Sequence, residues 1–174
     1  PLDKIFKNKA VIFHKNLGVF RKKYFNFFGL FSRFKKVLSS IFFISKIIKN
    51  EKIDIVYTNT SVIIAGGIAA KINSVYSYFH LHEIPTNKFY LLVIKSIINV
   101  TSDKIIVVSE AVKNYWNFDL TSKLNVIYNG FNFDVKTKKY KKLNDSLVFT
   151  SIGRLIPYKG NLYLLKIAKK LKEK

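Results

Sequence analysis

Short apolar runs alternate with longer amphipathic stretches along most of the chain, and this alternation constrains the fold more than any other feature. The apolar runs are rich in β-branched and aromatic residues and are bounded by turn residues, which is typical of buried strands. Strands that alternate with helices form parallel sheets with right-handed crossovers. The sequence therefore predicts an α/β fold with strands at residues 10–14, 53–58, 75–80, 104–108, 124–128 and 147–152.

The segment at residues 30–49 has the period of a helix that packs on a sheet. Its expected core face is traced by Phe27, Phe31, Phe34, Leu38, Ile41, Ser45 and Ile48. Other apolar residues widen this face, namely Phe25, Phe28, Phe42, Phe43 and Ile47, and they lie near Arg33, Lys35, Lys36 and Lys46. An ordinary core helix is the favoured interpretation, and a helix lying on a membrane surface is the alternative.

Four further helices are predicted between or after the strands. One ends at Asn73 after a turn and cap at residues 59–61, and its Gly66 and Gly67 allow close approach to the sheet. Ser109 is expected to cap a helix over residues 110–117, in which Trp116 is interpreted as packing. The other two helices are expected at residues 86–100 and from residues 160–161 onward.

The composition favours anionic partners. The formal net charge is +21, from 31 Lys and Arg against 10 Asp and Glu, which attracts nucleotide sugars, acidic lipids or nucleic acid. The chain has no Cys, so disulfides and thiolate metal sites are excluded. No apolar run reaches the ~18 residues that a membrane-spanning helix needs, and a cytoplasmic location is expected.

The end of the chain combines a predicted strand, a basic loop and a helix. Gly153 allows a sharp turn after the strand, and Arg154 and Lys159 place two cations in the loop. A helix N-terminus at the carboxyl end of a strand is a common phosphate site, and Arg and Lys both suit diphosphate binding. The alternative is that Arg154 and Lys159 are solvated loop cations in a Lys-rich chain.

Two histidines and an acid lie where the predicted strand at residues 75–80 ends. His80 and His82 are two residues apart and face one way on an extended chain, and Glu83 is adjacent. Without a third convergent ligand no metal site is predicted. Glu83 is equally well explained as the start of the following helix.

Five segments, in order, carry a resemblance to a known family. IDIVYTNTS, FHLHEIP, SDKIIVVSEAVKNYW, KLNVIYNGF and GRLIPYKG resemble glycosyltransferase family 4, whose members have the GT-B fold. The resemblance implies an incomplete, acceptor-side, Rossmann-like N-terminal domain at residues 1–131. A linker at 132–146 and the truncated start of a C-terminal nucleotide-sugar-binding domain at 147–174 would follow. The chain would then be a fragment, with the family's acidic E-x7-E motif beyond residue 174.

The same resemblance suggests roles for individual residues. His82 matches a histidine of the cleft near donor sugar and acceptor, where an imidazole can hydrogen-bond a sugar hydroxyl; the alternative is a solvated loop histidine. Gly153, Arg154 and Lys159 would hold the donor diphosphate. The further candidate cleft residues are Glu83, Ser109, Glu110, Asn129 and Gly130. Tyr128 stands where family members often have Pro.

The function implied is that of a retaining glycosyltransferase that needs no cofactor. It would transfer a sugar from a nucleotide-diphosphate sugar to a glycan or lipid-linked acceptor in cell-surface polysaccharide synthesis. The basic, Phe-rich first domain would suit docking on the inner face of the cell membrane. Two alternatives stay open. One is a basic nucleic-acid-binding module, although most Phe residues fall at predicted core positions. The other is a non-catalytic truncated remnant.

Overall fold

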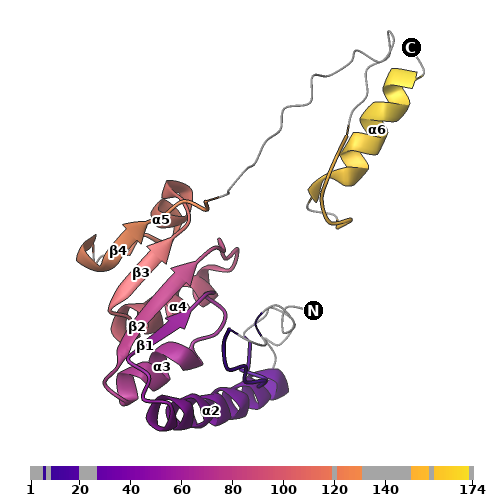
Figure 1. The fold of residues 1–174 in the computed structure, drawn as a ribbon. Helices are drawn as coiled ribbons and strands as arrows, with labels where there is room; N and C mark the ends of the chain where they lie inside the picture. The colour runs from indigo at the N-terminus through magenta and orange to yellow at the C-terminus, as the bar shows by residue number, and fades with distance from the viewer. Residues whose placement is uncertain are drawn as a thin grey trace. The chain divides into compact units, whose positions relative to one another are not determined.

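The computed structural model describes residues 6, 9–19, 27–118, 121–130, 150–156 and 159–172. Contacts divide the chain into two compact units, Pro1–Phe131 and Asn132–Lys174. Helices and strands alternate in the first unit (Figure 1). The elements are α2 (Phe27–Asn50), β1 (Ile55–Thr58), α3 (Ala65–Ile72), β2 (Tyr76–Leu81), α4 (Lys88–Thr101), β3 (Lys104–Val107), α5 (Glu110–Trp116), a 3-10 turn (Thr121–Lys123) and β4 (Leu124–Val126).

The four strands form one parallel sheet in the order β1-β2-β3-β4. Thr58 pairs with Phe79, and Leu81 pairs with Val107, which in turn pairs with Val126. Each crossover between neighbouring strands contains a helix, as parallel pairing requires. The predicted α/β class is therefore confirmed, and these four strands lie within the predicted runs or one residue beyond them.

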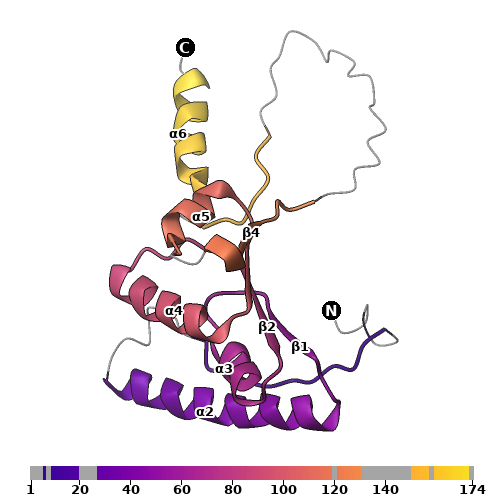
Figure 2. The same cartoon turned by 90° about the vertical axis from the view of Figure 1, so that its left-hand side faces the viewer.

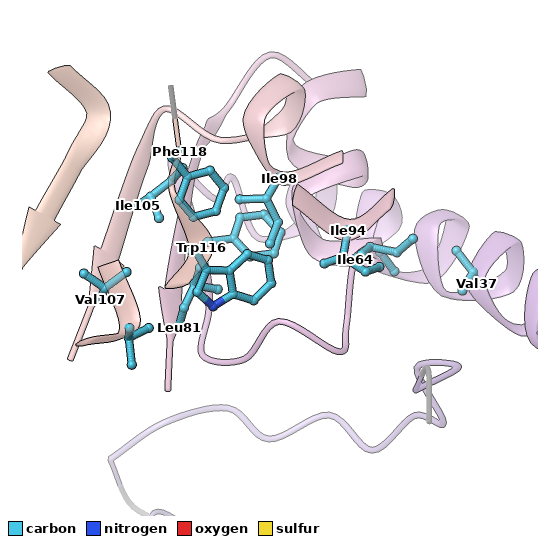
Figure 3. Close-up of a cluster of buried hydrophobic side chains, with 12 residues drawn as sticks. Val37, Ile64, Leu81, Ile94, Ile98, Ile105, Val107, Trp116 and Phe118 are labelled. Atoms are coloured by element: carbon cyan, nitrogen blue, oxygen red, sulfur yellow. The ribbon is translucent and has the colours of Figure 1, made fainter. Parts of the chain in front are cut away.

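One face of the sheet carries the core of the first unit. Along β2 every second side chain is buried, so Phe79 and Leu81 face the same way as Ile105 of β3. Helices α3, α4 and α5 cover this face, with Ile98 fully buried and Trp116 only 1% exposed. Figure 3 shows Trp116, Phe118 and Ile98 gathered over the strands.

Helix α3 approaches the sheet more closely than a helix with larger side chains could. A Cβ atom on Gly66 would lie 2.5 Å from Oγ1 of Thr58, and one on Gly67 would lie 2.4 Å from Cε2 of Phe79. These distances are far shorter than van der Waals contact, so both positions need glycine. The predicted reason for this glycine pair is confirmed.

Helix α2 is present as predicted, but its packing differs. It lies against α3, so that α3 separates it from the strands (Figures 1 and 2). Its buried or half-buried large apolar residues, among the described side chains, are Val37, Ile41, Phe43, Ile44, Ile47 and Ile48. Phe31, Phe34 and Leu38, which were expected in the core, are 56%, 59% and 40% exposed. The expected face is thus confirmed for Ile41, Ser45 and Ile48 and wrong for Phe31, Phe34 and Leu38, because apolar residues occur on several sides of this helix; the side chain of Phe27 lies outside the described part.

Two further expectations for the first unit are wrong. Residues 10–14 form no strand, because their backbone pairs with no strand that the structure describes. Val11 in this segment is 76% exposed. Residues 59–61 do not cap α3, which begins at Ala65 after Ile64 and has no side-chain cap. Their side chains make other hydrogen bonds, described below.

In the second unit, helix α6 (Asn161–Lys172) begins where the sequence predicts. Gly160 has a φ of +73°, a conformation that glycine adopts without strain, and it precedes the helix directly. Residues 150–152 form no strand, and Ile152 is 96% exposed. The strand expectation is wrong there, since these residues have no strand partner among those described; residues 147–149 lie outside the described part. None of the described helices combines the length and apolarity needed to cross a bilayer.

Candidate functional site

The parallel register of β1 and β2 brings together polar side chains at the carboxyl ends of the two strands. Three hydrogen bonds each join residues that are 23 positions apart. They link Tyr57 to His80, Asn59 to His82, and Thr60 to Glu83. The carboxyl edge of a parallel sheet is where open α/β folds place their ligands. This row of contacts is therefore the candidate site.

His82 is exposed, and its ring is held by Asn59. The Nε2–H group of His82 donates to Oδ1 of Asn59 over 2.7 Å. An amide oxygen can only accept, so His82 carries a proton on Nε2 in this hydrogen bond. In the tautomer whose single proton is on Nε2, the Nδ1 atom has a lone pair with which it can accept a hydrogen bond from a ligand hydroxyl.

His80 stands beside His82 on the sheet face opposite the core. Its ring centroid is 4.2 Å from that of His82, and its Nδ1 atom is 2.5 Å from the hydroxyl of Tyr57. Burial, and next the nearby His82, lower the pKa of His80 below its usual 6.5. His80 is therefore neutral near pH 7, and it adds no positive charge beside His82.

Glu83 is engaged with the loop that follows β1, and it does not start the next helix. Oγ1 of Thr60 donates to its Oε1 atom over 2.7 Å, while the backbone N–H and the hydroxyl of Ser61 donate to Oε2 over 3.2 Å each. The cap of α4 is Asn87, whose Oδ1 accepts from the N–H of Tyr90. The alternative of a helix-start role for Glu83 is wrong because the carboxylate binds a different segment.

Side chains of the core also hold the backbone of this site through hydrogen bonds. Nε1 of Trp116 donates to the backbone carbonyl of Glu83 over 2.9 Å, so a buried ring of α5 fixes the end of β2. The hydroxyl of Tyr90 donates to the carbonyl of Ser61 over 3.5 Å. Burial above all raises the pKa of Tyr90 to about 12, and its hydroxyl stays protonated.

Sequence reasoning missed Asn59 as the partner of His82 and Tyr57 as the partner of His80, which the strand register could have indicated.

The other candidate cleft residues follow the carboxyl ends of β3 and β4. Ser109 caps α5 as predicted, because its hydroxyl accepts from the N–H of Val112 over 3.2 Å. Glu110 is exposed and forms an ion pair of 3.1 Å with Lys113. Asn129 and Gly130 are exposed in the segment after β4. These residues thus share an edge with His82, and their roles toward a ligand stay predictions.

The predicted diphosphate loop lies in the second unit, immediately before α6. The side-chain amide of Asn161 donates to the carbonyl of Arg154 over 3.0 Å, and the N–H of Lys159 donates to the carbonyl of Ile156 over 3.0 Å. These bonds fold the loop back onto the start of the helix. Gly153 begins this loop, and a Cβ atom there would meet nothing within 4 Å. Binding of an anion by Arg154 and Lys159 stays a prediction.

Chemically, the His82 site offers an oriented imidazole at an exposed sheet edge. Within the described ranges no group of three His, Cys, Asp or Glu side chains is placed to hold a metal ion. An oriented acceptor of this kind suits the recognition of a ligand rich in hydroxyl groups.

Comparisons with known proteins identify the family. The model of Glycosyltransferase Family 4 matches residues 9–135. The capsular polysaccharide biosynthesis glycosyltransferase CapH of Staphylococcus aureus is 28% identical over 140 residues, which cover 74% of this chain and 39% of CapH. A crystal structure of HepE from Anabaena in complex with UDP has a TM-score of 0.48 and 24% identity, covering 53% of this chain and 27% of that one. A co-structure of MnaA from S. aureus with UDP has a TM-score of 0.43 and 20% identity, covering 51% and 26%. The match to the family model spans most of the chain, and the chain therefore belongs to glycosyltransferase family 4.

Proposed function

We propose that this chain contains the acceptor side of a retaining glycosyltransferase. The enzyme transfers a sugar from a nucleotide-diphosphate sugar to a glycan or lipid-linked acceptor, in the synthesis of a surface polysaccharide. Family membership and the likeness to CapH support the activity and the pathway class. The observation that carries the proposal is the orientation of His82 by Asn59 at the carboxyl edge of the sheet.

In this proposal His82 positions a sugar. Because its Nε2–H group is committed to Asn59, its Nδ1 atom accepts a hydrogen bond from a sugar hydroxyl. Neutral His80 keeps a positive charge away from this acceptor. Glu83 holds the neighbouring loop through Thr60 and Ser61, so the floor of the site is fixed before substrate arrives.

The donor diphosphate is assigned to the second unit. Arg154 and Lys159 precede α6, whose first backbone N–H groups carry the positive end of the helix dipole. These charges stabilise the nucleoside diphosphate as it leaves. Units 1–131 and 132–174 would then belong to the two different Rossmann-like domains of a GT-B enzyme.

Retention is assigned to a front-face reaction. The bond between the anomeric carbon and the phosphate oxygen breaks, and the acceptor oxygen bonds to the same face of that carbon. The proton of the acceptor hydroxyl passes to the departing phosphate. Among the described residues none is assigned as a nucleophile, and the carboxylate of Glu83, next to His82 in sequence, accepts hydrogen bonds from Thr60 and Ser61.

A donor screen tests the function. The gene product that contains this chain is incubated with a panel of nucleotide sugars and with polysaccharide or lipid-linked acceptors, and release of nucleoside diphosphate is measured. We expect acceptor-dependent release with one donor class, and a product whose anomeric configuration equals that of the donor. Salt-sensitive binding to random oligonucleotides with no response to any nucleotide sugar would overturn the proposal and favour a nucleic-acid-binding module.

A further inference from the structure

His80 contacts two other rings on the sheet face opposite the core. Its neighbours in β2, Phe79 and Leu81, are fully buried, so the alternation of a strand turns His80 to the other face. The rings of His80 and Tyr57 have centroids 5.9 Å apart and planes at 75° to each other. The rings of His80 and His82 have centroids 4.2 Å apart and planes at 40°. We call Tyr57, His80 and His82 the ring row.

Tyr57 fixes the orientation of the His80 ring. The hydroxyl of Tyr57 and Nδ1 of His80 share a hydrogen bond of 2.5 Å, which is at the short end of the usual range. A hydroxyl can donate or accept, so this bond forms with either tautomer of the neutral imidazole. Nε2 of His80 is buried and has no hydrogen-bond partner among the described residues. A flip of the ring would replace Nδ1 by a carbon beside Tyr57, and one orientation is therefore favoured.

His82 is held by one hydrogen bond and by the His80 ring. The bond from Nε2 of His82 to Oδ1 of Asn59 spans 2.7 Å, and both residues are exposed. A single hydrogen bond leaves a ring free to rock about the bonded atoms, and at an exposed position water competes for it. The His80 ring at 4.2 Å restricts this rocking, because the His82 ring would run into it. The direction of Nδ1 of His82 thus depends on His80.

We propose that Tyr57 and His80 are positioning residues for His82. Tyr57 fixes His80, and the His80 ring keeps His82 on Asn59, so that Nδ1 of His82 stays available to a sugar hydroxyl. Two neighbouring strands supply these contacts, since Tyr57 and Asn59 are two residues apart, as are His80 and His82. The inference rests on the proposed function for the sugar contact alone. The order of the ring row belongs to the chain itself and is measured without a sugar.

Simple packing of three rings on a sheet surface is the alternative to positioning. Packing depends on ring area, which Tyr57→Phe preserves, whereas positioning depends on the hydroxyl that this variant removes. Tyr57→Phe therefore separates the two explanations. The matched control is Tyr76→Phe, because Tyr76 lies on the same face at the start of β2 and is 63% exposed.

Nitrogen NMR of the 174-residue chain with isotope-labelled histidine tests the ring row. The chain has three histidines, and the signals of His14 serve as the internal reference. The exchange of the Nε2–H proton of His82 with water reports how well the bond to Asn59 is kept, because a hydrogen-bonded proton exchanges only when its bond opens. The backbone amide spectrum of each variant shows whether it is folded.

Loss of positioning should speed this exchange. We expect the rate for His82 to rise about fivefold in Tyr57→Phe and about tenfold in His80→Ala, with no change in Tyr76→Phe. If His80→Ala does not fold, Tyr57→Phe decides the result, since it keeps the ring. A wild-type rate for His82 in Tyr57→Phe, or an equal rise in Tyr76→Phe, would overturn the proposal.

Kinetics of the gene product that contains this chain give a second readout once a donor is found. We expect Tyr57→Phe to lower kcat/KM about fivefold, and to have no further effect in a His82→Ala background, because a positioning residue acts only through the residue it holds. An equal loss in both backgrounds would overturn the proposal. Wild-type kcat/KM in His82→Ala would instead contradict the sugar-binding role of His82, and the exchange rates would still decide the ring row.

Discussion

The two sites predicted from sequence differ in how their surroundings hold them. In the first unit, His82 and Glu83 are bound by Asn59, Thr60 and Ser61, and a buried Trp116 fixes the same strand end. In the second unit, the loop before α6 is closed by local bonds, such as that from Asn161 to Arg154. The apolar side chains around that loop, including Leu155 and Leu162, are 90% and 63% exposed.

This difference shows what a parallel sheet does for a binding site. Strand register brings residues 23 positions apart into contact, and a core of helices then fixes the strands. The hydrogen bonds described for the loop before α6 join residues near one another in sequence, so its geometry should depend less on a shared core. The geometry of the first site should thus be sensitive to mutations in the core of the first unit. The geometry of the second site should be much less sensitive to them.

The largest expected effect comes from removing core volume under the first site. Ile98→Ala should lower the free energy of unfolding by about 4 kcal/mol, because Ile98 is fully buried and a cavity would remain. Leu165→Ala in α6, at a residue 65% exposed, should change it by less than about 0.5 kcal/mol. Urea unfolding followed by Trp116 fluorescence and by far-UV circular dichroism measures both. Similar values for the two variants would break the comparison.

The next effect concerns the close approach of α3 to the sheet. Gly67→Ala should cost about 3 kcal/mol, since the new Cβ would lie 2.4 Å from the buried Phe79 ring. Gly130→Ala serves as the control, because nothing lies within 4 Å of a Cβ there. The same unfolding assay applies. Wild-type stability in Gly67→Ala would mean that α3 can move away from the sheet freely.

A smaller effect is expected at the two glutamates of the carboxyl edge. Glu83→Gln should destabilise the first unit by about 1 kcal/mol, because the half-buried carboxylate accepts three hydrogen bonds from Thr60 and Ser61. Glu110→Gln removes an exposed ion pair with Lys113 and should cost about 0.5 kcal/mol or less. Amide hydrogen exchange at Ser61 should speed up only in Glu83→Gln. If it is unchanged, Glu83 does not hold the loop.

The pH dependence of stability gives a further test. Burial, and then His82, lower the pKa of His80 below 6.5, so the unfolded chain binds more protons, and stability falls as pH drops below that value. Burial raises the pKa of Tyr90 from 10.0 to about 12, so the unfolded chain loses its proton first, and stability falls as pH rises through that range. The free energy of unfolding should fall less steeply toward acid pH in His80→Gln than in the wild type. It should fall less steeply toward alkaline pH in Tyr90→Phe. Unchanged profiles would contradict these environments.

The α/β class and most strand positions could be predicted because buried parallel strands leave short β-branched runs between helical segments. Ser109 was predictable as a cap because it directly precedes the first turn of α5. Gly66 and Gly67 were predictable because glycine inside a helix is costly without a packing reason.

Other features were hidden because a residue type can serve two purposes. Thr60 and Ser61 have side chains that suit a helix cap, yet they bind Glu83, which follows a strand about twenty residues later. The sequence could not distinguish the buried from the exposed apolar side chains of α2, because both sets are apolar. Only the position of α3 explains why Val37 is buried and Phe34 is exposed. Partners set by register, such as Asn59 for His82, need the strand alignment as well as the strands.

The most direct test of the central claim is the rate of sugar transfer by a His82→Ala variant of the gene product that contains this chain. Once a donor is found, kcat/KM is compared for the wild type, His82→Ala and the exposed control His14→Ala. We expect a loss of about 100-fold in His82→Ala, because an oriented acceptor for a sugar hydroxyl is removed, and no loss in His14→Ala. A His82→Ala enzyme with the wild-type kcat/KM would contradict the account.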